Sequence, residues 1–138
     1  MKIKRKGKTV GSDTSKPDLA HLTKAQYAIT QQCGTEPPFS GEYNKHYESG
    51  VYTCVCCGDK LFGSSAKYDS GSGWPSFWGT IGEGTLRTVV DESHGMVRRE
   101  IRCGKCDAHL GHVFEDGPRP SGLRFCVNSG ALGFIPEP

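Results

Sequence analysis

The sequence lacks any long apolar run. None of its hydrophobic stretches approaches the ~18 residues that a membrane-spanning helix needs, and no apolar signal-peptide core follows the first lysines. Strong net charge is missing too, because 17 Lys and Arg residues are offset by 15 Asp and Glu residues, which leaves +2. A dedicated nucleic-acid surface usually carries a larger positive excess. We therefore expect a cytoplasmic monomer that binds neither membranes nor nucleic acid.

The N-terminal segment has almost no apolar content. Residues 1–18 carry six Lys and Arg residues among scattered Ser, Thr and Gly. Such a composition cannot bury enough apolar surface to fold, so we interpret 1–18 as a disordered basic tail. Because the tail is Lys-rich and without amphipathic period, it only weakly suggests nuclear or organellar targeting. The remaining residues, 19–138, fit a single domain.

Glycine and proline are abundant, with 19 and 8 residues, and predict many turns between short strands. One helix is expected over Lys24–Thr30, because Thr23 and Gln26 have the spacing of a capping box. Pro37 prevents its continuation. Beyond residue 50, runs rich in β-branched and aromatic residues predict strands. These runs are 50–56, 86–92, 95–103, 109–116 and 123–135. The pattern indicates an all-β domain with a small helical N-terminal segment.

Seven cysteines include two pairs with metal-ligand spacing. Each C-x-x-C turn can aim two thiolates at one ion, and two such turns supply the four ligands of a structural zinc site. The first pair is ambiguous, because Cys56 could also pair with Cys54. We choose Cys57, which matches the second pair and precedes a glycine, and we expect Cys56 to be a small buried residue. The predicted ligands of one structural Zn²⁺ per chain are Cys54, Cys57, Cys103 and Cys106.

Cys126 stands apart from these pairs, inside "LRFCVNSG". If this segment is a strand, Arg124, Cys126 and Asn128 point to the same face. A guanidinium and an amide beside a thiol would lower its pKa, and the thiolate is the nucleophilic form. A hairpin through "EDGPRPSG" would bring His109 or His112 alongside. Buried inert cysteines and structural histidines are commoner, but together these residues favour thiol chemistry.

Four long motifs lie in one order along the chain. They are "GTEPPFSGEY", "YTCVCCGDKLF", "SGSGWPSFW" and "CGKCDAHLGHVFEDGPRPSGLRFCVNS". With them the chain resembles the type B methionine sulfoxide reductases (MsrB) from about Leu22 to Phe134. The resemblance implies twisted antiparallel β-sheets, short N-terminal helices, a four-cysteine zinc site and reduction of methionine R-sulfoxide, free or in proteins, as a repair reaction.

The resemblance also implies the roles of single residues. Cys126 matches the nucleophile, and the residues that match the rest of the active site are His109, His112, Asp116, Arg124 and Asn128. Trp74 and Phe77 match the substrate pocket. In this reading the Cys126 thiolate attacks the sulfoxide sulfur, a histidine protonates the departing oxygen, and Cys126 is left as sulfenic acid.

Many members of the family carry a resolving cysteine within the "SGxGWPSF" motif, where this chain has Ser72. A serine cannot form a disulfide. Cys33 and Cys56 are the candidates here, and some relatives place the resolving cysteine in the N-terminal region. We therefore expect a Cys126–Cys33 disulfide that thioredoxin reduces, with direct reduction of the sulfenic acid by thioredoxin or a small thiol as the alternative.

Two other functions compete with the enzyme. Zinc-clasped β domains also serve as protein-interaction modules, and fold alone does not determine function. Such a module has no need for Arg124, Cys126 and Asn128 in alternation beside Trp74. A nucleic-acid zinc ribbon would use the two cysteine pairs and the basic tail, but the folded part lacks a basic face.

Overall fold

A computed structural model describes residues 18–137 of the chain. The segment that we interpret as a basic tail lies almost entirely outside these residues. The described part holds one α-helix and otherwise mainly antiparallel strands, as the sequence predicted. Within residues 18–137, no helix has the length and apolar character that crossing a membrane requires.

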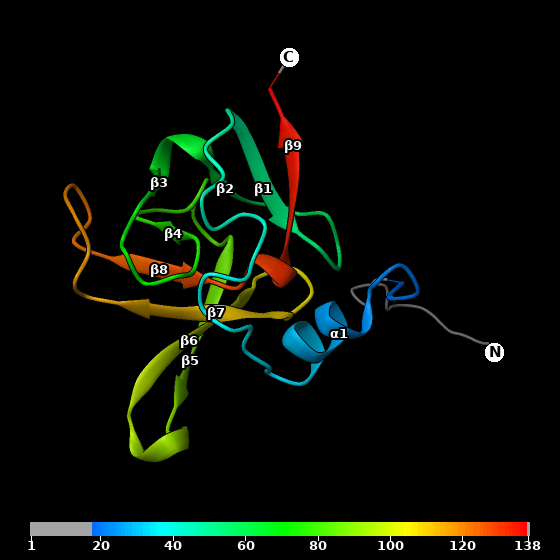
Figure 1. Cartoon of the computed structure of the whole chain (residues 1–138). Coiled ribbons are helices and arrows are strands. Elements are labelled where there is room, and N and C mark those ends of the chain that lie inside the picture. Colours follow the sequence, from blue (N-terminus) through cyan, green and yellow to red (C-terminus); the bar gives the residue numbers. More distant parts are fainter. Residues whose placement is uncertain (1–17, 138) are drawn as a thin grey trace.

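Helix α1 spans Lys24–Gln31 and begins as the capping box predicted. The Thr23 hydroxyl accepts a hydrogen bond from the Gln26 amide at 3.1 Å, and the Gln26 side chain accepts one from the Thr23 amide at 2.8 Å. The helix buries Ile29 and Thr30. It packs against strand β7 (His109–Phe114) and against the 3₁₀ turn η3 (Ser129–Ala131) (Figure 1).

A three-stranded sheet has the order β2-β1-β9. Its strands are β1 (Gly50–Cys54), β2 (Lys60–Gly63) and β9 (Leu132–Pro136). Both neighbours of β1 run antiparallel to it. This sheet therefore joins the first cysteine pair to the C-terminal segment of the domain.

A six-stranded sheet has the order β3-β4-β8-β7-β6-β5 and is antiparallel throughout. Its strands are β3 (Lys67–Tyr68), β4 (Ser76–Phe77), β5 (Leu86–Asp91), β6 (Arg98–Cys103), β7 (His109–Phe114) and β8 (Arg124–Val127). The β5–β6 hairpin extends away from the rest of the domain (Figure 1). Large apolar side chains between the two sheets form the core, and Phe62 stacks on Phe77 with ring centroids 4.2 Å apart.

The five predicted runs all contain strands, with two differences. The last run, 123–135, is split into β8 and β9 by η3 (Ser129–Ala131). Three short strands, β2, β3 and β4, were not predicted. Two of them have only two residues each, which is too short for a periodic pattern to appear.

Candidate active site

Cys126 lies in the middle of the six-stranded sheet. Its direct cross-strand partners are Ser76 on β4 and His112 on β7. Directly opposed residues project from the same face of a sheet. On this face the Cys126 side chain lines a cavity of about 310 Å³. Other residues around that cavity include Ser72, Trp74, Arg98, His112, Phe114 and Arg124.

The Cys126 thiol is in contact with the Ser72 side chain. The Ser72 hydroxyl lies 3.9 Å from the Cys126 sulfur. Burial raises the pKa of Cys126 above its ordinary value, and the contacts with Ser72 and Arg124 offset only part of that effect. The predicted lowering of this pKa is therefore wrong in sign for the substrate-free protein, because burial outweighs the positive charge.

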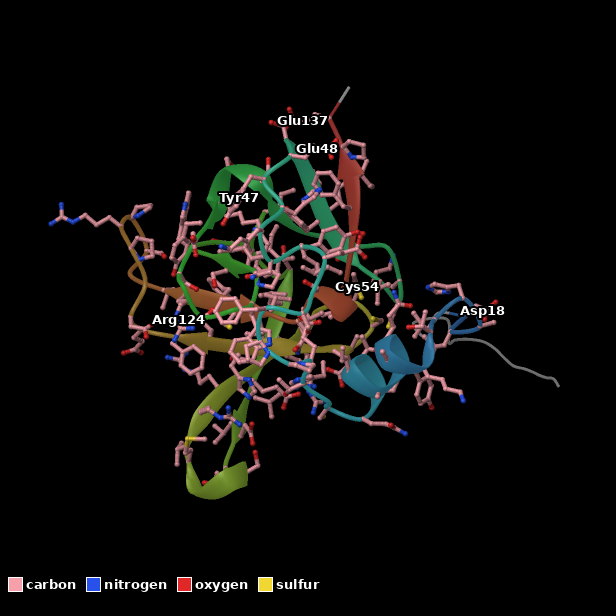
Figure 2. All side chains as sticks on the ribbon, viewed as in Figure 1. Asp18, Tyr47, Glu48, Cys54, Arg124 and Glu137 are labelled. Carbon is pink, nitrogen blue, oxygen red and sulfur yellow. The ribbon has the colours of Figure 1, made fainter. Side chains whose placement is uncertain are left out.

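Arg124 brings positive charge to the cavity but shares it with a carboxylate. Its Nε and Nη2 atoms donate to the two oxygens of Asp116 at 2.9 and 3.0 Å. The guanidinium also lies over the Phe114 ring, 4.4 Å from its centroid. The Arg124 hydrogen bonds lower the pKa of Asp116, so this carboxylate stays charged and weakens the effect of Arg124 on the thiol. Figure 2 shows Arg124 and Cys54 on different sides of the domain.

His112 is the histidine that reaches the cavity. Its Nε2 atom lies 2.8 Å from Oδ2 of Asp91, a residue on β5. The pKa of Asp91 is held well below its usual range, mainly by hydrogen bonds from Ser93 and then by the hydrogen bond with His112. Arg98 also donates to Oδ2 of Asp91 at 3.3 Å. The Asp91 carboxylate accepts from Nε2–H and so fixes the orientation of the ring.

His109 does not line the cavity. Its ring is buried and its Nδ1 lies 2.6 Å from Oε2 of Glu100. The Nε2 atom has no partner among the described residues. Burial lowers the pKa of His109, although Glu100 partly compensates. Between the two predicted histidines, the structure therefore favours His112 as the group that meets substrate.

Asn128 links the segment that follows α1 to the six-stranded sheet through hydrogen bonds. Its Nδ2 donates to the Leu110 carbonyl at 3.0 Å and its Oδ1 accepts from the Glu36 amide at 3.1 Å. The Glu36 carboxylate in turn accepts from the amides of Ser129 and Gly130, both at 2.9 Å. Asn128 borders the cavity, but its polar atoms are used in these contacts rather than on Cys126.

The two predicted substrate-binding aromatics lie in different places. Trp74 lines the cavity, and its indole N–H donates to the Glu36 carbonyl at 3.0 Å. Phe77 is fully buried in the core, against Phe62 and Tyr52. The structure places Phe77 away from the cavity, in contrast to the predicted contact with substrate, because Phe77 follows Ser76 on β4 and side chains alternate between the faces of a sheet.

The four predicted metal ligands come together, as Cys54, Cys57, Cys103 and Cys106 place their sulfur atoms within 4.8 Å of one another. The Cys54–Cys106 and Cys57–Cys103 sulfur pairs are 3.6 and 3.7 Å apart. Four sulfurs at the corners of a tetrahedron with 2.3 Å metal bonds would be about 3.8 Å apart. The donor set therefore fits a tetrahedral metal ion and not disulfides, whose sulfurs are about 2.05 Å apart.

The two cysteine turns have matching backbones. The Gly58 amide donates to the Cys54 carbonyl at 2.8 Å, and the Asp107 amide donates to the Cys103 carbonyl at 2.9 Å. Gly58 and Asp107 both have positive φ, at 80° and 69°. Cys56 is buried, as predicted, and its Sγ accepts a hydrogen bond from Nε2 of Gln31 at 3.4 Å.

Sequence reasoning missed Asp91, Arg98, Glu36 and Glu100, which orient the predicted residues. Asp91 lies near the end of the predicted strand 86–92, and Glu100 alternates with Arg98 along the next one. These positions are visible as strand residues, but their partners depend on the register β5-β6-β7, which the sequence does not reveal.

Comparison with known proteins gives a consistent result. Residues 22–136 match the family described as "SelR domain". A relative from Thioalkalivibrio sulfidiphilus is 54% identical over 90% of this chain and 90% of its own length. Relatives from Synechococcus sp. and Hahella chejuensis are 58% and 59% identical, over 82% of this chain and 83% and 81% of their own lengths. Each of the three is named "Peptide methionine sulfoxide reductase MsrB".

Proposed function

This chain belongs to the SelR domain family, and on that premise we propose that it reduces methionine R-sulfoxide, free or in proteins, to methionine. The observation that carries the proposal is the position of Cys126. A lone thiol on the face of a sheet shares its cavity with Trp74, His112 and Arg124. An apolar wall, a proton donor and a nucleophile are the three groups that the reaction needs.

Trp74 and Phe114 give the cavity apolar walls that suit the methyl and methylene groups of the substrate. The sulfoxide oxygen then requires a hydrogen-bond donor. His112, which Asp91 holds through Nε2, is the residue to which we assign this role, with Nδ1–H as the donor to this oxygen. Protonation of the oxygen makes the sulfoxide sulfur electrophilic.

The Cys126 thiolate attacks that sulfur, so that an S–S bond forms as the S–O bond breaks, and the oxygen leaves with the His112 proton as hydroxide. Hydroxide then attacks the Cys126 sulfur. The S–S bond breaks, methionine leaves with its electron pair, and Cys126 becomes sulfenic acid. The substrate sulfur gains two electrons and Cys126 loses two. Since burial raises the pKa of Cys126, the free enzyme holds mainly the thiol near neutral pH.

Cys33 is the thiol that best fits resolution of the sulfenic acid. It is exposed, whereas Cys56 is buried beside Gln31. Thr35, two residues after Cys33, lines the Cys126 cavity. We propose a Cys126–Cys33 disulfide that is reduced by thioredoxin, so that the protein serves in repair of oxidised proteins.

Zinc is the metal that best fits the four-cysteine cluster. Four thiolates in tetrahedral arrangement are a common structural zinc set, and the sulfur separations of 3.6 and 3.7 Å agree with it. The ion would join β1 to β6 and the turns that follow them. With four protein ligands it has no open position for substrate, so its role is structural.

The test of the function is turnover of dabsylated methionine R-sulfoxide with dithiothreitol. The wild-type protein should reduce the R epimer, and Cys126→Ser should lower the rate by at least about 10³, as loss of a nucleophile does. Cys56→Ser is the matched control and should retain activity, because Cys56 lies outside the cavity. An inactive wild type would favour the interaction module, and an active Cys126→Ser would refute the nucleophile.

A further inference from the structure

Cys33 adopts an unusual backbone conformation where α1 ends. Its φ is 55°, in the left-handed region, where a residue other than glycine costs about 1 kcal/mol. The next residue, Gly34, donates its amide hydrogen to the Ala28 carbonyl at 2.9 Å. The chain thus turns back toward the helix at Cys33. A contact of the Cys33 side chain helps to stabilise this backbone conformation.

That contact is with Glu100 on β6. The Cys33 sulfur donates to Oε2 of Glu100 at 3.9 Å. The same oxygen accepts from Nε of Arg102 at 2.8 Å and lies 2.6 Å from Nδ1 of His109. Although burial alone would raise the pKa of Glu100, these partners lower it. The sulfur therefore faces a buried carboxylate that remains charged.

The donor atoms of Cys33, Glu100 and His109 lie within 4.8 Å of one another, as in a metal site. Arg102, however, binds both carboxylate oxygens of Glu100, at 2.8 and 3.4 Å. A metal ion would have to displace this guanidinium or lie beside its positive charge. The cluster is therefore better explained as a network that holds the thiol.

Strand register separates Glu100, the partner of Cys33, from the nucleophile. Glu100 is opposite His112, and His112 is opposite Cys126. Two strand spacings put the Cα atoms of Glu100 and Cys126 roughly 10 Å apart. A disulfide needs the two sulfurs in bonding contact, and the Cys33 sulfur contacts Glu100 instead. It therefore has to leave Glu100 before it can bond to Cys126.

The segment that would move is short. Helix α1 ends at Gln31, and Glu36 is anchored to Ser129 and Gly130 by hydrogen bonds of 2.9 Å. Between Gln31 and Glu36, the side chains of Cys33 and Thr35 are exposed. Rotation of a few backbone bonds here can shift Cys33 without disturbing the sheet.

We propose that Glu100 is a positioning residue that holds Cys33 as a protonated thiol, away from Cys126, until the sulfenic acid has formed. The significance of this contact for turnover depends on the proposed resolving role of Cys33. After release, Cys33 gives up its proton and its sulfur attacks the sulfur of the sulfenic acid. The S–O bond breaks as the S–S bond forms, and the hydroxide leaves with that proton as water.

The charges around Cys33 agree with this role. Partial burial and then the charge of Glu100 raise the pKa of Cys33, Arg102 opposes them, and Asp91 adds a small rise. The last turn of α1 contains no basic residue, and His109 acts on the thiol through Glu100. Since a thiolate is repelled by the carboxylate that the thiol binds, loss of the proton also favours release.

The experiment measures alkylation of Cys33 by iodoacetamide against pH, by mass spectrometry, in the reduced full-length protein with its metal retained. In Glu100→Gln the reaction midpoint should move to lower pH, and the rate at pH 7 should rise about 3- to 10-fold because the thiolate is no longer disfavoured. Glu115→Gln is the control, since this exposed carboxylate contacts Arg99. Equal profiles for Glu100→Gln and wild type would overturn the proposal.

Two further measurements keep the proposal testable if Glu100→Gln does not fold or if Cys33 is not the resolving thiol. Within the wild type, the Cys33 midpoint should be higher in the native protein than in urea; an equal or lower native midpoint would also overturn the proposal. In a single turnover without reductant, Glu100→Gln should form the Cys126–Cys33 disulfide several-fold faster at pH 7, and slower formation would contradict it. Absence of that disulfide in the wild type would instead refute the resolving role of Cys33, whatever the alkylation profiles show.

Discussion

Ser72 shows how much one side chain can change in this site. Its hydroxyl lies 3.9 Å from the Cys126 sulfur and also contacts the Ser70 hydroxyl at 2.8 Å. A thiol at this position would be almost in bonding distance of the nucleophile. In the proposed mechanism the serine leaves the sulfenic acid without a thiol beside it, so resolution has to come from a thiol elsewhere.

This difference can be tested by peptide mapping after one turnover with excess sulfoxide and no reductant. Wild-type protein should contain a disulfide between Cys126 and Cys33. In Ser72→Cys the disulfide should instead join positions 126 and 72, because a small rotation brings the two sulfurs together, and Cys33 should stay free. A wild-type protein with Cys126 as sulfenic acid and Cys33 unmodified would refute the resolving role.

At the scale of secondary structure, α1 connects the capping box at one end to Cys33 at the other. The helix has only eight residues, too few to be stable alone. Its stability comes from the cap and from Ile29 and Thr30, which are buried against the domain. The position of Cys33 therefore depends on a short and weakly stabilised element.

Thr23→Ala should lower the free energy of unfolding by about 1 kcal/mol, because the N-cap hydroxyl satisfies the Gln26 amide. Urea unfolding followed by circular dichroism measures the change. Thr23→Ser keeps the hydroxyl and should lie close to wild type. A Thr23→Ala protein as stable as Thr23→Ser would show that the cap contributes nothing.

At the scale of the whole molecule, the four-cysteine cluster holds together segments about 45 residues apart in the chain. Cys54 ends β1 of the small sheet, and Cys103 ends β6 of the large sheet. Structural zinc contributes on the order of 10 kcal/mol to such folds, which equals the entire net stability of a typical domain.

Removal of one ligand should therefore unfold the domain. Cys103→Ser should bind well under one zinc per chain and lose the cooperative thermal transition, as measured by metal analysis and calorimetry. Cys56→Ser should keep one zinc and a cooperative transition, since Cys56 is not one of the four clustered sulfurs. Fully folded wild-type protein with well under one zinc per chain would contradict the metal assignment.

The sequence by itself determined those features that depend on neighbouring residues. The capping box placed the start of α1, the spacing of the cysteine pairs identified the four clustered ligands, and residue types marked the longer strands. Four motifs in one order along the chain identified the family. These patterns predict structure reliably because the spacing of residues in the chain directly sets the local geometry.

Tertiary structure alone decided which groups face one another. Strand register places Asp91 on His112 and Glu100 on His109, and alternation sends Phe77 into the core while Ser76 lies opposite Cys126. Burial, which reversed the expected pKa shift of Cys126, is a property of the packed domain. No local pattern contains this information, because each of these pairs joins residues on different strands whose alignment is decided by the packing of the whole sheet.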